Sequence, residues 1–381
     1  MSEEAQNAPR TAKAQTPPST PAAPSALTAS GAASHRAARR MALWLFFMCA
    51  LVAAMVIVGG ATRLTDSGLS ITEWRPVTGV VPPLTEAGWL EELEKYRQIP
   101  EYREVNYGMS LADFKFIYWW EWGHRLLGRA IGLAFFIPMA FFIATGQARR
   151  PLSWKLAGLF LLGGLQGALG WYMVQSGLSE RVDVSQYRLA AHLSLAVLLF
   201  ALMFWLALDL WPARRIGRDA APKGLRIGAA LLAAGVFAQM TLGAFVAGLR
   251  AGRTFNTWPL MDGKFFPDGY FAGTPGLNDL FETAAAVQFN HRIGAYLLAA
   301  GAVWFAIAAR RTGAVSRARW VLAAVVGQML LGVWTVLAAT PIALGLAHQG
   351  GALIVLATAL YAAHGLTSAR ASTAAGRAAH R

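Results

Sequence analysis

The sequence predicts an all-α membrane protein whose eight transmembrane helices form two tandem four-helix bundles, related by a pseudo-two-fold axis along the membrane normal. Three observations predict this class. Of its 381 residues, 56% are hydrophobic and only 14% are charged, a composition that excludes an ordinary soluble protein. Eight apolar runs each approach the roughly twenty residues needed to cross a bilayer. The motifs of the first half also recur, in the same order, in the second.

The apolar runs divide the chain into units. Residues 1–35 are rich in Ala, Pro, Ser and Thr and are predicted to be a disordered tail. The first run, 41–61, is too long for a signal-peptide core and is read as a retained helix. The other runs cover 124–145, 154–175, 189–211, 225–249, 288–309, 319–340 and 343–364. The predicted units are an N-terminal bundle, 36–212, with a long connection at 62–120, a C-terminal bundle, 213–366, with a long connection at 250–287, and a second tail, 367–381.

The distribution of basic residues predicts the orientation. The net charge is +14, but the cations form short clusters between apolar runs, which argues for the positive-inside rule and against nucleic-acid binding. One face carries Arg149-Arg150, the cluster at 214–218, Arg310-Arg311, Arg317 and Arg319. We therefore expect a bacterial inner (plasma) membrane protein with both termini in the cytoplasm. The single cysteine, Cys49, lies in an apolar run and excludes a disulfide or a cysteine-based metal cluster within one chain.

The two long connections lie on the opposite, outer face and contain many aromatic residues. The first carries Trp74-Arg75-Pro76 and the second carries Trp258-Pro259. Trp and Tyr favour the membrane–water interface, so the connections are predicted to be ordered caps rather than unrelated turn-rich loops, which are the alternative.

An internal repeat relates the two halves. The sequence EWGHR at 121–125 opens one apolar run, and QFNHR at 288–292 opens another. The pattern Gln-x-x-Leu-Gly begins at Gln166, Gln239 and Gln328. Four spans separate equivalent segments, so the halves are predicted to have the same membrane orientation.

Four histidines occupy matching positions near the outer face: His124 and His192 in the first half, His291 and His348 in the second. A lone histidine in an apolar helix is most often a packing residue, but four at one depth indicate metal ligation. Imidazole is a good ligand for iron, and two histidines on facing helices can supply both axial ligands of a haem, or one ligand and an open position. Zinc is the alternative, with Glu121 as the only nearby carboxylate.

The halves differ beside these histidines. Glu121 lies three residues before His124, whereas Gln288 takes that place in the second half. Arg188 lies four residues before His192, where the second half has a leucine. We infer that the first half holds the reacting group, with Glu121 accepting or supplying protons, and that the second holds a permanent cofactor that passes electrons. The alternative is that Glu121 forms an interfacial salt bridge with an arginine.

Arginines at the outer helix ends run against the positive-inside trend. Their guanidinium groups match carboxylates such as the haem propionates, although snorkelling to lipid headgroups is the alternative for any one of them. These arginines are Arg63, Arg125, Arg188, Arg250, Arg253 and Arg292.

Taken together, these motifs resemble the haem A synthase family. The resemblance rests on the two histidine–arginine stretches, the segment 59–70 (GGATRLTDSGLS) with Trp74-Arg75-Pro76, and 258–261 (WPLM), and it covers about residues 40–365. It implies a membrane oxidoreductase that converts haem O to haem A by successive hydroxylation of a ring methyl to a formyl group, for cytochrome oxidase biogenesis. Some members carry a cysteine pair in the first outer connection. This chain has none there and is more similar to the proteobacterial and mitochondrial branch.

The resemblance also implies roles for individual residues. His124 and His192 correspond to the ligands of the substrate haem O, with Glu121 as the associated carboxylate, and His291 and His348 to the ligands of haem b. From the residues themselves, Arg125, Arg188 and Arg292 are candidate cofactor-binding groups. The implied partners are haem O, the lipid bilayer, haem O synthase, cytochrome oxidase assembly factors and an electron donor that the sequence does not identify. A homo-oligomer is compatible with the sequence.

Two other functions stay open at the level of sequence. A di-haem electron-transfer protein of cytochrome b type needs the same four histidines but leaves its haems unmodified. A transporter or assembly scaffold is suggested by the repeat alone.

Overall fold

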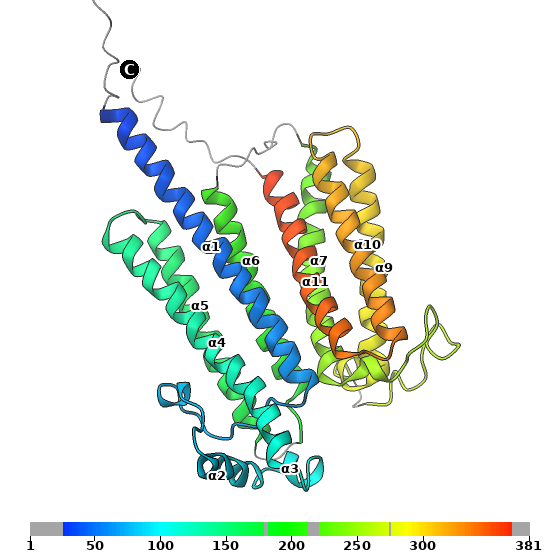
Figure 1. The fold of residues 1–381 in the computed structure, drawn as a ribbon. Coiled ribbons are helices and arrows are strands. Elements are labelled where there is room, and N and C mark those ends of the chain that lie inside the picture. The colour runs from blue at the N-terminus through cyan, green and yellow to red at the C-terminus, as the bar shows by residue number, and fades with distance from the viewer. Residues whose placement is uncertain (1–25, 179–181, 212–220, 274–275, 368–381) are drawn as a thin grey trace, which may run out of the picture.

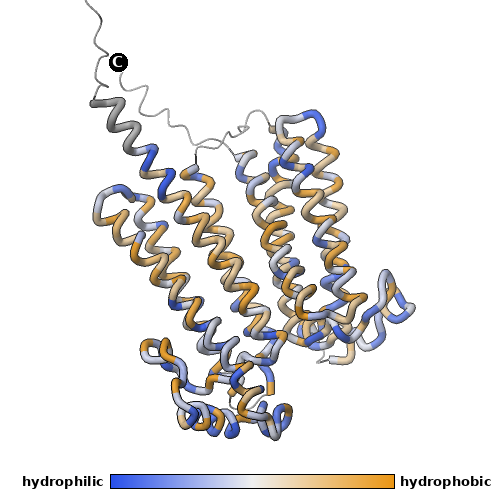
Figure 2. The backbone as a smooth tube through the Cα atoms, viewed as in Figure 1, coloured by the Kyte–Doolittle hydropathy of each residue, from blue (hydrophilic) through white to orange (hydrophobic). Residues whose placement is uncertain are grey.

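The computed structural model describes residues 26–178, 182–211, 221–273 and 276–367, and within them it is almost entirely helical (Figure 1). Eight of its helices are long and apolar enough to cross a membrane, as predicted. They are α1 (Ala26–Leu64), α4 (Leu111–Ala144), α5 (Leu152–Gly177), α6 (Gln186–Leu210), α7 (Lys223–Gly248), α9 (Ala284–Ala308), α10 (Val315–Leu337) and α11 (Ile342–Gly365). Hydrophobic residues cover the bodies of these helices, and hydrophilic residues gather at their ends (Figure 2).

The eight helices form two closed rings of four. In the first ring α1 packs on α4 and α6, and α5 joins α4 to α6; in the second α7 packs on α9 and α11, and α10 joins α9 to α11. The rings meet where α1 contacts α11, α6 contacts α7 and α6 contacts α11. The equivalent helices therefore make equivalent contacts, as two tandem bundles require. The two-fold axis itself stays a prediction.

Polar contacts join the bundles within the apolar interior. The Gln349 amide on α11 donates to the Val56 carbonyl on α1 at 3.1 Å, and the hydroxyls of Ser194 and Thr241 lie 2.9 Å apart across α6 and α7. These contacts give polar groups a partner within the protein, which the bilayer interior cannot supply.

Two helices begin more than ten residues earlier than predicted. Helix α1 starts at Ala26, inside the segment expected to be a disordered tail, because the alanine-rich sequence before Arg36 has high helix propensity. Helix α4 starts at Leu111, where the Ser110 hydroxyl accepts a hydrogen bond from the Asp113 amide. His124 therefore lies well inside α4 rather than in its first turns. Residues 1–25 and 368–381 of the predicted tails, and the basic cluster at 214–218, lie outside the described residues.

The first long connection forms an ordered cap, as predicted. It contains a 3₁₀ turn (Thr78–Val80) and the helices α2 (Glu86–Tyr96) and α3 (Pro100–Glu104). The cap has its own core, in which Trp89, Leu93 and Tyr96 pack on the extension of α4 at Phe114 and Tyr118. The second connection is shorter and contains a 3₁₀ turn (Ala251–Arg253) and α8 (Asp279–Glu282). We call the end of the bundles that carries both connections the outer end.

Candidate functional site

The four histidines lie in parts of the helices that contain few fully buried residues. On α4 no residue between Glu121 and Phe135 is buried, and on α9 none between Gln288 and Ala302. The same holds for 160–176 on α5, 326–334 on α10 and 343–352 on α11. The main hydrophobic core instead occupies the inner halves of the bundles. At the level of the histidines the side chains of these helices are therefore covered less completely than those of the inner halves.

Each histidine ring packs against a glycine on the preceding membrane helix. A Cβ atom on Gly59 would lie 3.1 Å from the His124 ring, and one on Gly243 would lie 3.1 Å from His291. The corresponding distances are 2.9 Å for Gly170 and His192 and 2.8 Å for Gly332 and His348. These approaches are closer than almost any side chain allows. The glycines therefore permit each imidazole to approach its neighbouring helix closely, a role that the sequence pattern alone did not reveal.

The ring geometry of the second pair fits a haem. The ring centres of His291 and His348 are 6.3 Å apart, and their planes are inclined at 76°. A ligating imidazole nitrogen lies about 2 Å from a transition metal and about 1 Å from its own ring centre, so two axial imidazoles place their ring centres about 6 Å apart. That the four histidines act as two couples of ligands stays a prediction.

The donor set around these couples favours haem over zinc. Among the residues that the structure describes, no group of three or more His, Cys, Asp and Glu side chains is placed to hold a metal ion. A structural zinc site needs such a group, whereas an iron porphyrin brings its remaining ligands with it.

Glu121 lies at the contact between α4 and the cap and is only 2% exposed. One carboxylate oxygen accepts a hydrogen bond from the Arg125 guanidinium. The other accepts from the Ser70 hydroxyl at 2.8 Å and from the Ile71 amide at 2.7 Å. The Ser70 hydroxyl has the Ile117 carbonyl as a second acceptor at 3.3 Å. Glu121 therefore forms the salt bridge that the sequence left as an alternative, and it also anchors the start of the cap.

The second half repeats this anchor with a neutral amide. Gln288 accepts from Arg292 at 3.3 Å and donates to the carbonyls of Ala251 at 3.0 Å and Phe255 at 3.2 Å. In the first half the connection offers N–H and O–H donors, which require an acceptor; in the second it offers carbonyls, which require a donor. The difference between Glu121 and Gln288 thus follows partly from the backbone that each of them holds.

The predicted cofactor-binding arginines fall into two groups. Arg125 donates to the carbonyls of Ile71 and Glu73 at 2.7 and 3.0 Å. Arg292 donates to the carbonyls of Phe255 and Leu260 at 3.0 and 3.4 Å. Each of these arginines therefore binds the backbone of the outer connection in its own half. Arg188 instead lies over the Tyr172 ring at 4.9 Å, and among the described residues it has no ion-pair partner. Of the three, Arg188 is the one whose guanidinium is available to a carboxylate ligand.

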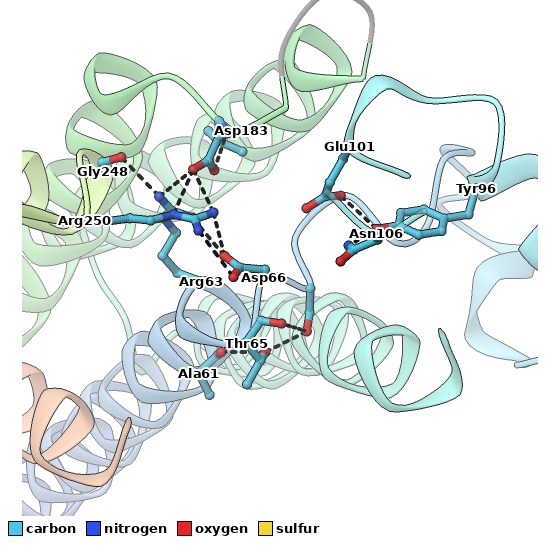
Figure 3. Close-up of polar contacts among 12 residues, drawn as sticks. Ala61, Arg63, Thr65, Asp66, Tyr96, Glu101, Asn106, Asp183, Gly248 and Arg250 are labelled. Carbon is cyan, nitrogen blue, oxygen red and sulfur yellow. Dashed lines mark hydrogen bonds and ion pairs between the residues drawn. The ribbon is translucent and has the colours of Figure 1, made fainter. Parts of the chain in front are cut away.

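Arg63 and Arg250 form a charge cluster with Asp66 and Asp183 at the junction of the two bundles (Figure 3). Asp183 accepts from Arg63 at 2.8 Å and from Arg250 at 3.0 Å, and Arg250 also reaches Asp66 at 2.8 Å. Arg63 donates further to the Gly248 carbonyl at 3.1 Å. These two outer arginines are thus neutralised by the protein itself. The cluster ties the ends of α1 and α7 to the α5–α6 connection.

Glu101 is a buried carboxyl group in the cap, 5% exposed, whose side chain accepts a hydrogen bond from Tyr96 at 3.3 Å (Figure 3). Burial raises the pKa of Glu101 from 4.5 to about 8, the Tyr96 hydroxyl opposes this rise, and the nearby carboxylate of Glu121 adds to it. Glu101 is therefore mainly protonated at neutral pH. No motif or spacing in the sequence marked Glu101 as a buried group.

The raised pKa of Glu101 predicts a pH dependence for the cap. The folded cap binds this proton more tightly than the unfolded chain, so its stability should fall as the pH rises from about 4.5 to about 8 and then level off. Limited proteolysis of the cap at pH 6 and pH 9 measures this. We expect faster cleavage at pH 9 in the native chain and equal rates in Glu101→Gln, which stays neutral. A pH dependence that persists in Glu101→Gln would assign it to another group.

Comparisons with known proteins agree with this geometry. Residues 42–360 match the family model described as "Cytochrome oxidase assembly protein". A protein of Parvibaculum lavamentivorans named "Heme A synthase" is 54% identical over 334 residues, which are 88% of this chain and 95% of the relative. Proteins with the same name from Nitrosospira multiformis and Bradyrhizobium diazoefficiens are 50% and 51% identical, over 86% and 87% of this chain and 93% and 92% of theirs. The chain therefore belongs to the cytochrome oxidase assembly protein family, together with these heme A synthases.

Proposed function

We propose that this protein is a haem A synthase, a membrane oxidoreductase that converts haem O to haem A by successive oxidation of a ring methyl to the formyl group. The observation that carries the proposal is the identity of about half of all aligned residues to heme A synthases over nearly their whole length. The paired histidines in each bundle support it, because the reaction acts on a haem and needs a second redox centre to pass electrons.

The second bundle is assigned the resident haem b. His291 and His348 would hold its iron, supported by their 6.3 Å ring separation. When bound, haem b supplies one-electron transfer to the neighbouring site. The protein's part is to fix the two imidazoles and to exclude water with the apolar walls of α7, α9, α10 and α11.

The first bundle is assigned the substrate, haem O. His124 and His192 would hold it at the iron, and Arg188 would bind a propionate, since its guanidinium has no ion-pair partner among the described residues. Glu121 would accept or supply protons at the oxygen that faces Ser70, because the Ser70 hydroxyl can turn to the Ile117 carbonyl while the Ile71 amide still holds that oxygen in place. Glu121 would thus combine its anchoring contacts with proton transfer.

The orientation follows from charge. We assign the end of the bundles opposite the caps to the cytoplasm, because the connections there carry Arg149-Arg150 and Arg310-Arg311. Both histidine couples then lie near the periplasmic face of the inner membrane. Haem O would arrive from haem O synthase and haem A would pass to cytochrome oxidase assembly factors. The electron donor and a homo-oligomeric state stay predictions.

A haem-pigment assay tests the proposal. The gene is expressed in a bacterium that makes haem O but lacks its own haem A synthase, and the extracted haems are separated and weighed by mass spectrometry. We expect haem A to appear with the native chain and to be absent with His124→Ala. If the protein binds haem and only haem O and haem b are recovered, the di-haem electron-transfer function is correct instead.

A further inference from the structure

The Gln-x-x-Leu-Gly motifs place a glutamine against three of the four histidines. The amide nitrogen of Gln239 on α7 lies 3.1 Å from Nδ1 of His291 on α9 and 2.8 Å from the main-chain carbonyl oxygen of the same residue. Gln328 on α10 lies 3.0 Å from Nδ1 and 2.7 Å from the carbonyl oxygen of His348. The motif therefore supplies two contacts in each case: the glycine packs under the ring, and the glutamine holds its Nδ1 edge.

The second histidine of the first bundle has the same partner. The amide nitrogen of Gln166 on α5 lies 3.2 Å from both Nδ1 and Nε2 of His192 and 3.0 Å from its carbonyl oxygen. The amide oxygens of Gln166 and Gln239 are buried without a hydrogen-bond partner. A buried amide oxygen without a donor is costly, which points to a donor that these glutamines meet in another state of the protein.

The fourth histidine breaks the pattern. Gly59 on α1 lies against the His124 ring as Gly243 on α7 lies against His291, but the ring atoms differ. A Cβ atom on Gly59 would be nearest Nε2 of His124, whereas one on Gly243 would be nearest Cε1 of His291. Four residues before Gly59, where the other motifs have glutamine, the chain has Met55. The methyl carbon of Met55 would lie 3.5 Å from a Cβ atom on Gly128, so Met55 packs on α4 one helical turn after His124. A thioether is only a weak acceptor and cannot donate, so His124 has no such amide beside it.

We propose that Gln166, Gln239 and Gln328 are positioning residues for iron-ligating histidines, and that Met55 leaves His124 as the exchangeable ligand of the substrate site. The inference rests on the proposed function, since it takes these histidines to be haem ligands. Three ligands are held in place from the neighbouring helix, and one is free to leave the iron. That asymmetry lies at the site where a substrate haem has to enter, react and depart.

The chemistry of imidazole supports the role of the glutamines. A histidine that ligates iron through Nε2 carries its proton on Nδ1, and an acceptor for that proton fixes the ring and makes it a stronger ligand. In Gln166 and Gln239 the amide nitrogen donates to the histidine carbonyl, and the amide oxygen is unpartnered. A rotation of the side chain that keeps the nitrogen on this carbonyl would bring the oxygen to Nδ1–H, where it accepts the imidazole proton.

The test compares Gln239→Met with the native full-length protein in detergent. Methionine keeps the volume of glutamine and copies the residue that the chain uses beside His124. We expect haem b to be bound with a raised reduction potential, because its ligand is a weaker donor, and to transfer to apomyoglobin about 10- to 100-fold faster. An unchanged potential together with an unchanged transfer rate would overturn the positioning role.

The reciprocal variant, Met55→Gln, tests the exchangeable ligand. Carbon monoxide added to the reduced native protein should bind the haem of the first bundle and leave haem b unchanged. Met55→Gln should slow this binding about tenfold or more and increase the low-spin fraction of that haem, because His124 is now held. Equal carbon monoxide binding in both proteins would overturn the inference while leaving the proposed function intact. A native protein that binds no haem would instead reject the proposed function, and with it this inference.

Discussion

Replacing His291 with alanine should remove haem b and abolish the production of haem A. The variant deletes one of two imidazoles whose ring centres are 6.3 Å apart and leaves His348 as the remaining histidine of the pair. Loss of a direct ligand should weaken haem retention by more than the roughly 10- to 100-fold typical of second-shell changes. Absorption spectra of the purified variant and the haem-pigment assay measure the two effects.

His364 provides the matched control for His291→Ala. It is also a buried histidine, 2% exposed, but it lies at the inner end of α11, where its ring bonds Asp209 at 3.1 Å. His364→Gln should therefore keep both haems and the activity. If His291→Ala retained the haem b spectrum while His364→Gln lost it, the assignment of the second couple would be wrong.

Glu121→Gln should leave haem b in place and reduce haem A formation by about 100-fold or more, the range of a lost proton-transfer group. The carboxylate accepts from three donors, of which the Ser70 hydroxyl and the Ile71 amide belong to the cap. A glutamine has one acceptor oxygen and places its NH₂ group against one of these donors, so part of the anchor is lost as well.

Two further measurements separate the chemical role of Glu121 from its anchoring role. Limited proteolysis of the cap reports the anchor, and Ser70→Ala removes one anchoring donor without removing the carboxylate. We expect Ser70→Ala to raise the rate of cleavage about as much as Glu121→Gln does, while keeping most of the activity. Equal losses of activity in the two variants would mean that Glu121 acts through the cap alone.

Much of the fold could be predicted from the sequence because bilayer thickness sets the length of an apolar run. All eight spans were predicted in this way, as was their grouping into two bundles. The start of α4 was not, since residues 111–123 are covered by the cap and follow no membrane pattern. The start of α1 was missed because helix propensity in the alanine-rich segment carries no hydrophobic signal.

The site could be predicted only where it repeats within the sequence. The four histidines stand out because two copies align, and the glutamine motifs were visible as part of that repeat. Their contact with the rings was not, because Gln239 and His291 lie on different helices and meet only through helix packing. The pairing of Arg63 with Asp183 depends on a connection that no local pattern marks, so the sequence left Arg63 among the arginines that could meet either a haem propionate or a lipid headgroup.

The haem content of the purified protein tests the central claim most directly. Absorption spectroscopy and mass analysis of the extracted pigments count the haems and identify them. The duplicated histidine couples predict up to two haems per chain, with haem b always present and haem O or haem A as the second. The second haem should be lost in His124→Ala while haem b stays. A colourless protein, or a haem content that is unchanged when His124 and His291 are each replaced, would contradict the account.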